Sequence, residues 1–178
     1  MRELDIGLHN FVKDFLIGKA NLIGIEIGSY AGESAEIFLS SNAFKRFYCI
    51  DPWEPGFDPN DQSTSAGLVN AEKKFNLKFK NNRIIIKLKN KSSDVLNLFE
   101  DNSIDFIYID GNHQYDFVKW DIEHYYNKVK NGGIISGHDY EVSGFTPHIR
   151  GVKKAVDEYF KKPPLKIYSD NSWVYIKS

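Results

Sequence analysis

The apolar residues of this chain alternate between short continuous runs and longer stretches with helical spacing. Residues 104–109 form one of the short runs, rich in β-branched and aromatic side chains, and the run stops at Asp110-Gly111. Such a run before turn residues is typical of a buried strand. From Tyr115 to Lys130 the apolar positions recur at helical spacing, with Lys119 and Asp121 among the polar positions expected to face water. The sequence therefore predicts a strand followed by an amphipathic helix.

The end of this helix is predicted at Asn131-Gly132-Gly133, and residues 134–137 resume an extended apolar run. A strand, a helix and a strand in this order make two parallel strands whose carboxyl ends lie on one edge of the sheet. Open α/β sheets bind their ligands at that edge. The residues expected to converge there are Asp110, His113, His138 and Asp139. Two carboxylates and two imidazoles in one place indicate a reaction centre.

The same periodicity predicts the remaining elements. Helices are expected up to residue 18 and around residues 35–39, 67–79, 93–99 and 152–160, and strands at residues 22–27, 47–50, 84–86, 165–168 and 173–176. The alternation predicts an α/β fold with a doubly wound, mostly parallel sheet of about seven strands. Helices should cover both faces of the sheet, and the terminal strand should be antiparallel.

Length and composition fit one globular domain. The chain has 178 residues, 42% of them hydrophobic, and a net charge of −1, which gives no general attraction to nucleic acid or to an anionic membrane. No apolar run approaches the ~20 residues of a membrane span, and Asp5 and His9 interrupt any signal-like segment. We expect a cytoplasmic protein with one domain, residues 1–178. Within it, residues 1–18 form an N-terminal helix, a candidate lid, and residues 20–178 form the core.

A glycine-rich turn links the first strand to the helix that follows. Glycines in such a turn let a ligand approach the backbone, whose amides can donate to it. The spacing is Glu-x-Gly-x-x-x-Gly, at Glu26, Gly28 and Gly32, and not the Gly-x-Gly-x-x-Gly of dinucleotide folds. Asp51, at the end of the second strand, is placed to accept hydrogen bonds from the two hydroxyls of a ribose. Two alternatives stay open: a plain tight connection for the turn, and a helix cap or turn role for Asp51.

With these motifs the sequence resembles the class I S-adenosylmethionine-dependent methyltransferases, whose fold is Rossmann-like. The likeness covers residues 20–178 and is nearest to the metal-dependent O-methyltransferases of the catechol type and the small bacterial sugar and macrolide O-methyltransferases. Residues 25–34, IEIGSYAGES, match the family's first motif. The resemblance implies that the cofactor's methionine part lies against the turn residues Glu26, Gly28, Ser29, Tyr30, Gly32 and Ser34. It implies further cofactor contacts from Asp51 to the ribose, from Ser92 and Ser93 to the adenine, and from Trp53 and Asp110.

The resemblance also implies a metal site. The family's ligands lie at the ends of its fourth and fifth strands, where this chain has Asp110 and the pair His138-Asp139. Catechol-type enzymes carry an acid and an amide as that pair, so His138 departs from the pattern and leaves metal identity and dependence open. His113 falls where those enzymes have a catalytic lysine, and an imidazole with an unperturbed pKa of ~6.5 suits a base near neutral pH. The structural alternatives are a strand-ending turn at Asp110, a helix cap at His113 and a backbone hydrogen bond at His138.

We therefore predict an enzyme that moves a methyl group from S-adenosylmethionine to a hydroxyl of a sugar or another small molecule. Its catalytic residues would be His113, Asp110 and His138. A divalent cation, Mg²⁺ or Mn²⁺, would be held by Asp110, His138 and Asp139. Two rivals remain, a metal-dependent hydrolase with the same cluster and a non-catalytic cofactor-binding protein. Acceptor contacts are expected on the loops at residues 54–65 and 141–150. No nucleic-acid or membrane partner is expected, and a homo-oligomer stays open.

Overall fold

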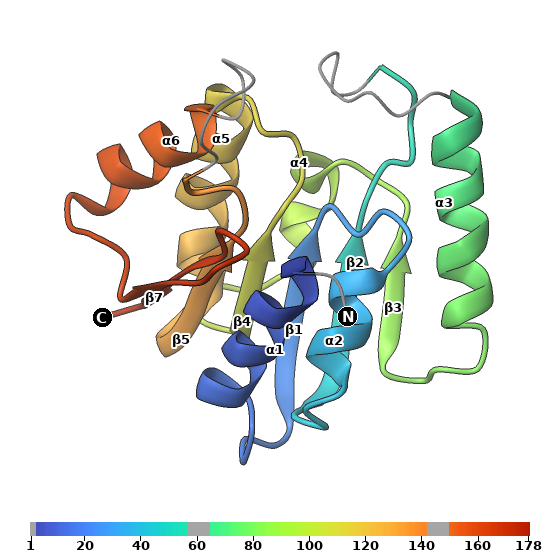
Figure 1. The fold of residues 1–178 in the computed structure, drawn as a ribbon, viewed down its shortest axis with the longest axis horizontal. Helices are drawn as coiled ribbons and strands as arrows, with labels where there is room; N and C mark the ends of the chain where they lie inside the picture. Colours follow the sequence, from blue (N-terminus) through green and yellow to red (C-terminus); the bar gives the residue numbers. More distant parts are fainter. Residues whose placement is uncertain (1–2, 57–64, 142–149) are drawn as a thin grey trace.

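The fold is a seven-stranded sheet with helices on both faces, shown in Figure 1 by a computed structural model that describes residues 3–56, 65–141 and 150–178. The strand order is β3-β2-β1-β4-β5-β7-β6. Neighbours among the first five strands are parallel, whereas β7 runs antiparallel to β5 and β6. The strands are β1 (Leu22–Ile27), β2 (Phe44–Ile50), β3 (Ile85–Leu88), β4 (Ile104–Ile109), β5 (Val129–Gly137), β6 (Lys166–Ile167) and β7 (Trp173–Ile176). The predicted α/β sheet with an antiparallel terminal strand is confirmed.

The helices pack in two layers, with α1 and α2 in front of the sheet in Figure 1 and α4 and α5 behind it. They are α1 (Glu3–Phe15), α2 (Glu33–Leu39), α3 (Ser65–Lys78), α4 (Ser92–Val95), α5 (Tyr115–Tyr125) and α6 (Arg150–Phe160), with the 3₁₀ turns η1 (Leu96–Leu98) and η2 (Tyr126–Lys128). Each layer buries its own apolar cluster against the sheet. In the parts of the chain that the structure describes, none of the helices combines the length and hydropathy that crossing a bilayer requires.

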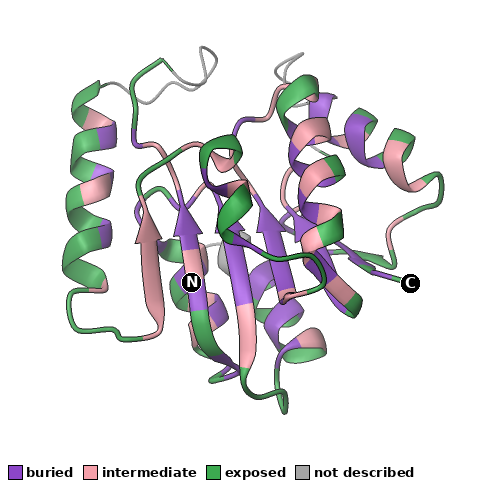
Figure 2. Cartoon of the chain, turned by 180° about the vertical axis from the view of Figure 1, so that it is seen from behind, coloured by how far each residue is buried: buried purple, intermediate pink, exposed green. Residues whose placement is uncertain are grey.

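The central strands are apolar because both of their faces are covered. All residues of β4 except Asp105 are buried, and the burial colours of Figure 2 show the same for the middle of the sheet. Two-sided burial explains why residues 104–109 read as a continuous apolar run and not as an alternating one. Asp105, the exception, accepts hydrogen bonds from the Ile23 amide (2.8 Å) and the Lys130 amine (2.7 Å), so its carboxylate joins β4 to β1 and β5.

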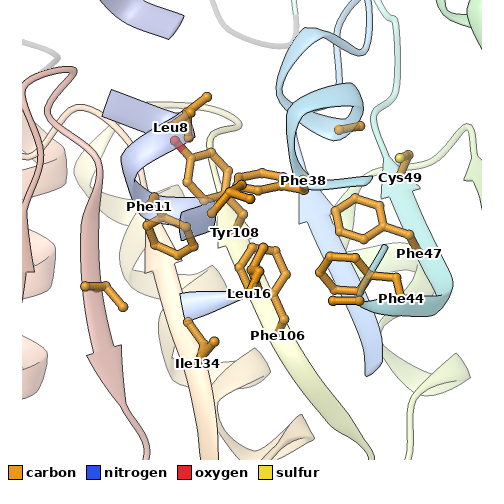
Figure 3. Packing of buried hydrophobic residues seen from close by; sticks show 14 of the residues in the cluster. Leu8, Phe11, Leu16, Phe38, Phe44, Phe47, Cys49, Phe106, Tyr108 and Ile134 are labelled. Atoms are coloured by element: carbon orange, nitrogen blue, oxygen red, sulfur yellow. The ribbon is translucent and has the colours of Figure 1, made fainter. Parts of the chain in front are cut away.

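Helix α1 is anchored in the front cluster. Phe11 is fully buried, and its ring contacts those of Phe38, Phe106 and Tyr108, as Figure 3 illustrates. Close packing also occurs at Gly7, where an added Cβ would lie 2.2 Å from the carboxylate of Asp170. This helix therefore contributes to the core. A role as a lid stays a prediction.

Helix α5 ends earlier than its apolar pattern predicts. It stops at Tyr125, and Val129 already pairs with Ile104 as the first residue of β5. The glycines that were expected to end the helix lie inside β5. The Gly132 amide donates to the Lys177 carbonyl (2.7 Å), and the Lys177 amide donates to the Gly133 carbonyl (2.9 Å). The pairing with the segment after β7 holds this stretch extended, which local spacing could not reveal.

Candidate active site

The turn between β1 and α2 lies directly against the end of β4. Gly28 has a φ of 90°, and an added Cβ there would stand 2.0 Å from the backbone oxygen of Asp110. At Gly32, with a φ of 78°, an added Cβ would meet the ring of Phe79 at 2.5 Å. The glycines were expected to make room for a ligand, but the atoms that exclude a side chain here belong to the protein itself. The turn is therefore fixed against Asp110.

Beneath this turn lies a buried carboxylate, that of Glu26. Its Oε1 accepts a hydrogen bond from the Ser34 hydroxyl (2.6 Å). Glu26 Oε2 and the hydroxyl of Ser29 find no hydrogen-bond partner within the residues that the structure describes. Burial raises the pKa of Glu26 to about 7, and it outweighs the nearby hydroxyls of Ser29 and Ser34, which act in the opposite direction. A buried acceptor and a buried hydroxyl without partners suit a polar ligand that brings donors.

Asp51 connects the segment after β1 with the segment after β2 through hydrogen bonds. Its two carboxylate oxygens accept hydrogen bonds from the Tyr30 amide (2.8 Å) and the Trp53 amide (2.6 Å). The indole of Trp53 donates to the Tyr30 carbonyl (2.8 Å), and both residues have positive φ, 42° for Tyr30 and 44° for Trp53. The turn role that the sequence left open for Asp51 is thus present. Each carboxylate oxygen can accept more than one hydrogen bond, so ribose binding remains compatible with this clamp.

Ser92 and Ser93 begin α4 but face different surroundings. The Ser92 hydroxyl donates to Asp121 Oδ1 (2.6 Å), and its carbonyl accepts from the Tyr125 hydroxyl (2.8 Å). Ser93 is exposed and contacts its neighbour Asp94 (3.3 Å). Asp121 was expected to face water, yet it is 4% exposed, and burial raises its pKa to about 7. Sequence reasoning missed this residue because an acid beside an apolar stripe is most often solvated.

The four residues that were expected to meet at the carboxyl edge do meet. His113 Nε2 lies 2.9 Å from Asp139 Oδ2 and 3.6 Å from Asp110 Oδ1. His138 Nδ1 lies 3.2 Å from Asp139 Oδ1 and 3.9 Å from Asp110 Oδ1. The two imidazoles therefore share the same two carboxylates. Asp139 has a φ of 60°, a conformation that non-glycine residues seldom adopt outside functional or tightly held positions.

These contacts decide the protonation of the cluster. Burial opposes a charge on His113, but hydrogen bonds to Asp110 and Asp139 outweigh it and raise its pKa to about 10. For His138, burial is likewise outweighed by the charge of Asp110 and the hydrogen bond to Asp139, and its pKa rises to about 9. The same hydrogen bonds hold the pKa of Asp139 well below its usual range despite burial. Both imidazoles therefore carry protons at neutral pH in the protein alone, and neither has the pKa of an ordinary histidine base.

Three side chains of this cluster are close enough together to hold a metal ion. Across the described residues, Asp110, His113 and Asp139 have ligand atoms that all lie within 4.8 Å of one another and could hold one ion. The set predicted from sequence, Asp110, His138 and Asp139, has the same two acids and His138 in place of His113, and it stays a prediction. His113 was expected to be the base instead. Two carboxylates and one imidazole suit Mn²⁺ and related divalent cations better than an all-oxygen set would.

Comparisons with known proteins find a matching methyltransferase family and solved structures with a similar fold. A family model described as a methyltransferase domain matches residues 25–140. A Bacillus cereus O-methyltransferase, solved in complex with SAH, is 13% identical with a TM-score of 0.64, and the match covers 98% of this chain and 80% of that one. A Corynebacterium glutamicum protein is 16% identical with a TM-score of 0.60, covering 98% and 78% of the two chains.

A more distant likeness is to the spermidine synthase of Thermotoga maritima, at 12% identity and a TM-score of 0.58. That match covers 94% of this chain and 57% of the synthase, so the chain spans little more than half of that enzyme. A comparison with curated proteins gives no match. Structural likeness at such identities shows the fold alone.

Proposed function

The chain belongs to the methyltransferase-domain family and is a class I S-adenosylmethionine-dependent methyltransferase, and from that premise we propose that it methylates oxygen, at a hydroxyl of a sugar or another small molecule. One observation carries this proposal. The turn that would hold the methyl donor and the cluster that would hold the acceptor are in direct contact, because Gly28 packs on the backbone of Asp110. The Asp110 amide also donates to the Ile27 carbonyl (2.8 Å). Donor and acceptor bound at these neighbouring places would meet without any rearrangement.

The residues present fit the cofactor. Glu26 Oε2 and the Ser29 hydroxyl, both buried and without partners within the described residues, would take hydrogen bonds from its methionine part. Asp51 would accept from the ribose hydroxyls, and Ser92 and Ser93 would lie beside the adenine. Trp53 is buried and bonds to the Tyr30 carbonyl, so we assign it the task of holding the turn. S-adenosylmethionine supplies a methyl group already activated on a sulfonium, so the protein has to position and deprotonate the acceptor.

The residues of the cluster also fit a divalent cation, Mg²⁺ or Mn²⁺, which we assign to Asp110, His113 and Asp139. The cation would offset the carboxylate charges and so lower the pKa of both the acceptor hydroxyl and His138. His138 then becomes our candidate for the base that receives the acceptor proton. The hydrogen-bonding contact between its Nδ1 and Asp139 (3.2 Å) fixes the orientation of the ring.

The decisive experiment is methyl transfer from labelled S-adenosylmethionine to a panel of sugars and other hydroxyl compounds, with products identified as methyl ethers. S-adenosylhomocysteine should also raise the melting temperature of the protein. Stabilisation without turnover across a broad panel would favour a non-catalytic cofactor-binding protein. Hydrolysis of an ester or phosphate without any stabilisation by S-adenosylhomocysteine would favour the metal-dependent hydrolase.

Cofactor affinity should depend on pH through Glu26. The pKa of its buried carboxyl is about 7, and a cofactor ammonium beside it favours the ionised form. Below pH 7 binding must displace a proton, so the affinity for S-adenosylhomocysteine should fall roughly tenfold per pH unit, and it should level off above pH 7. Calorimetry between pH 5.5 and 8.5 measures this. Glu26→Gln should give a flat profile, and an unchanged slope in that variant would remove Glu26 from the binding site.

Metal removal should abolish activity. EDTA should stop methyl transfer, and Mn²⁺ should restore it at least as well as Mg²⁺ because one ligand is an imidazole. The His113 proton must leave before the ring can bind a metal, since its pKa is about 10. The affinity of stripped protein for Mn²⁺ should therefore rise with pH between 7 and 9. Calorimetry in buffers of different ionisation enthalpy counts the released protons. Full activity in chelator would rule out the cation.

Several further points stay predictions. The loops expected to contact the acceptor, at residues 54–65 and 141–150, lie largely outside the described residues. The identity of the acceptor therefore depends on the substrate panel. Three expectations from the sequence stay predictions: the cytoplasmic location, the single domain over residues 1–178 and the absence of a nucleic-acid partner. The oligomeric state stays open.

A further inference from the structure

Helix α6 packs beside α5, and its start lies directly on the backbone that follows β4 (Figure 1). The second residue of the helix, Gly151, is buried. An added Cβ there would stand 2.7 Å from the His113 carbonyl oxygen and 2.5 Å from the Tyr115 amide nitrogen. Backbone atoms cannot move aside as the end of a flexible side chain can. The start of α6 therefore holds the backbone of His113 in place.

The side chain of Tyr115 connects the segment after β4 to α6 a second time. This tyrosine lies two residues after His113, and its hydroxyl donates a hydrogen bond to Glu158 (2.5 Å). The amine of Lys154 lies over the same ring, 4.4 Å from its centre. Lys154 and Glu158 are four residues apart, and their charged groups lie 3.9 Å apart, so they share one face of α6. Tyr115 is thus held by an acid and a lysine of that face.

The neighbouring positions of α6 hold the segment after β5 in the same way. Tyr140 directly follows Asp139 and is 4% exposed, and its hydroxyl donates a hydrogen bond to Asp157 (2.5 Å). The amine of Lys153 lies 4.0 Å from the centre of the Tyr140 ring and 3.4 Å from the Asp157 carboxylate. Two adjacent pairs of a lysine and an acid on one helix therefore hold two tyrosines. Each tyrosine lies within two residues of a residue that we assign to the metal.

We propose that α6 sets the spacing between His113 and Asp139 by holding the two segments that carry them. Gly151, Asp157 and Glu158 are the positioning residues. Strands β4 and β5 both end before the two ligands, so pairing within the sheet does not by itself determine the 2.9 Å between their side chains. Metal affinity depends on groups that orient the ligands as well as on the ligands themselves. This inference rests on the proposed function, which makes both residues metal ligands.

The first test removes the two tyrosine hydroxyls without changing any charge. Stripped protein with Tyr115→Phe and Tyr140→Phe together should bind Mn²⁺ about threefold to tenfold more weakly than the wild type. The effect is moderate because the acids of both contacts are about half exposed, and exposed contacts of charged groups are individually weak. The affinity for S-adenosylhomocysteine should not change, since no residue assigned to the cofactor is altered. Calorimetry measures both affinities.

Tyr175→Phe is the matched control. The Tyr175 hydroxyl donates to the Lys162 carbonyl, just after the end of α6 (2.7 Å), so this variant also removes a hydrogen bond between a tyrosine and the α6 region. Tyr175 lies in β7, which carries no residue of the cluster. This substitution should lower the melting temperature and leave Mn²⁺ binding as it is in the wild type.

Gly151→Ala should have the larger effect, because the new methyl group meets backbone atoms of the segment after β4. Mn²⁺ binding should weaken tenfold or more. Alanine favours a helix more than glycine does, so such a loss cannot come from helix propensity. Should this variant fail to fold, the double tyrosine variant provides the same test.

Two results would overturn the proposal. Wild-type affinity for Mn²⁺ in the double tyrosine variant would mean that the cluster keeps its spacing without α6. Equal weakening of Mn²⁺ binding in Tyr175→Phe, or a parallel loss of S-adenosylhomocysteine binding, would mean that the contacts of α6 stabilise the whole fold and not the cluster. If the wild-type protein did not bind Mn²⁺, the proposed metal site would fail first, and this inference with it.

Discussion

Replacing His113 by alanine should slow methyl transfer by roughly 10²–10⁴-fold, whether the imidazole acts as base or as metal ligand. The ring lies between both carboxylates of the cluster, 2.9 Å from Asp139 and 3.6 Å from Asp110. Its side chain is 32% exposed, so the variant should fold and bind S-adenosylhomocysteine as the wild type does. The rate at saturating cofactor, the melting temperature and a binding titration measure these three properties. An unchanged rate would remove His113 from the mechanism.

His138→Ala is the matched variant that separates the two roles. If His113 is a metal ligand, His113→Ala loses most of its affinity for Mn²⁺, whereas His138→Ala keeps Mn²⁺ and loses rate. The family resemblance assigns the roles the other way round, with His138 as the ligand and His113 as the base. Calorimetry of Mn²⁺ binding to both stripped variants therefore decides between geometry and resemblance. Weakening of Mn²⁺ binding in His138→Ala alone would return the metal site to the set predicted from sequence.

Gly28→Ala should destabilise the protein by roughly 4 kcal/mol or more, a large part of the stability of an ordinary domain. The backbone there has a φ of 90°, and the new methyl group would stand 2.0 Å from the Asp110 carbonyl oxygen. Backbone atoms of two adjacent strand ends cannot yield as a flexible side chain would. The turn and the end of β4 would have to separate, and cofactor binding should be lost with them. Urea unfolding and S-adenosylhomocysteine titration measure the two effects.

Gly18→Ala is the control for the backbone contribution. Gly18 has a φ of 81°, close to that of Gly28, but an added Cβ there meets no atom of the described residues within 4 Å. This substitution should cost about 1–2 kcal/mol, the price of a left-handed conformation alone. Similar losses of stability in the two variants would show that the contact between Gly28 and Asp110 relaxes easily. The packing of the turn on the cluster would then not support the proposal that donor and acceptor bind next to each other.

The sheet and the edge cluster could be predicted because they depend on order along the chain. Parallel strands joined through a helix bring their carboxyl ends together. Asp110 and the His138-Asp139 pair each follow such a strand, and this is enough to bring them close together. The prediction needs no knowledge of side-chain packing. The order of the elements could not predict which histidine lies closer to the two acids. That depends on the path of the segment after β4 and on the positive φ of Asp139.

The remaining differences have the same physical origin. Asp121 is buried by its pairing with Ser92, a contact between segments far apart in sequence. The glycines inside β5 are held extended by pairing with the segment after β7, and the clamp at Asp51 depends on the conformations of Tyr30 and Trp53. Periodicity reports how each segment divides between core and solvent. Hydrogen bonds between segments far apart in the sequence do not change this periodicity, so it cannot reveal them.

The place of β7 in the sheet has a consequence for the synthesis of the protein. This strand pairs with β5 from Ile134↔Ile176 to Gly137↔Trp173, and within the described residues β7 is the one strand that pairs with β6. A ribosome makes β5 well before β7, so a growing chain carries the edge of β5 without its partner while α6 is still being translated. An unpaired, apolar strand edge is a template for association with other chains. Pairing of β7 with β5 therefore removes an association-prone edge that the growing chain keeps until β7 is made.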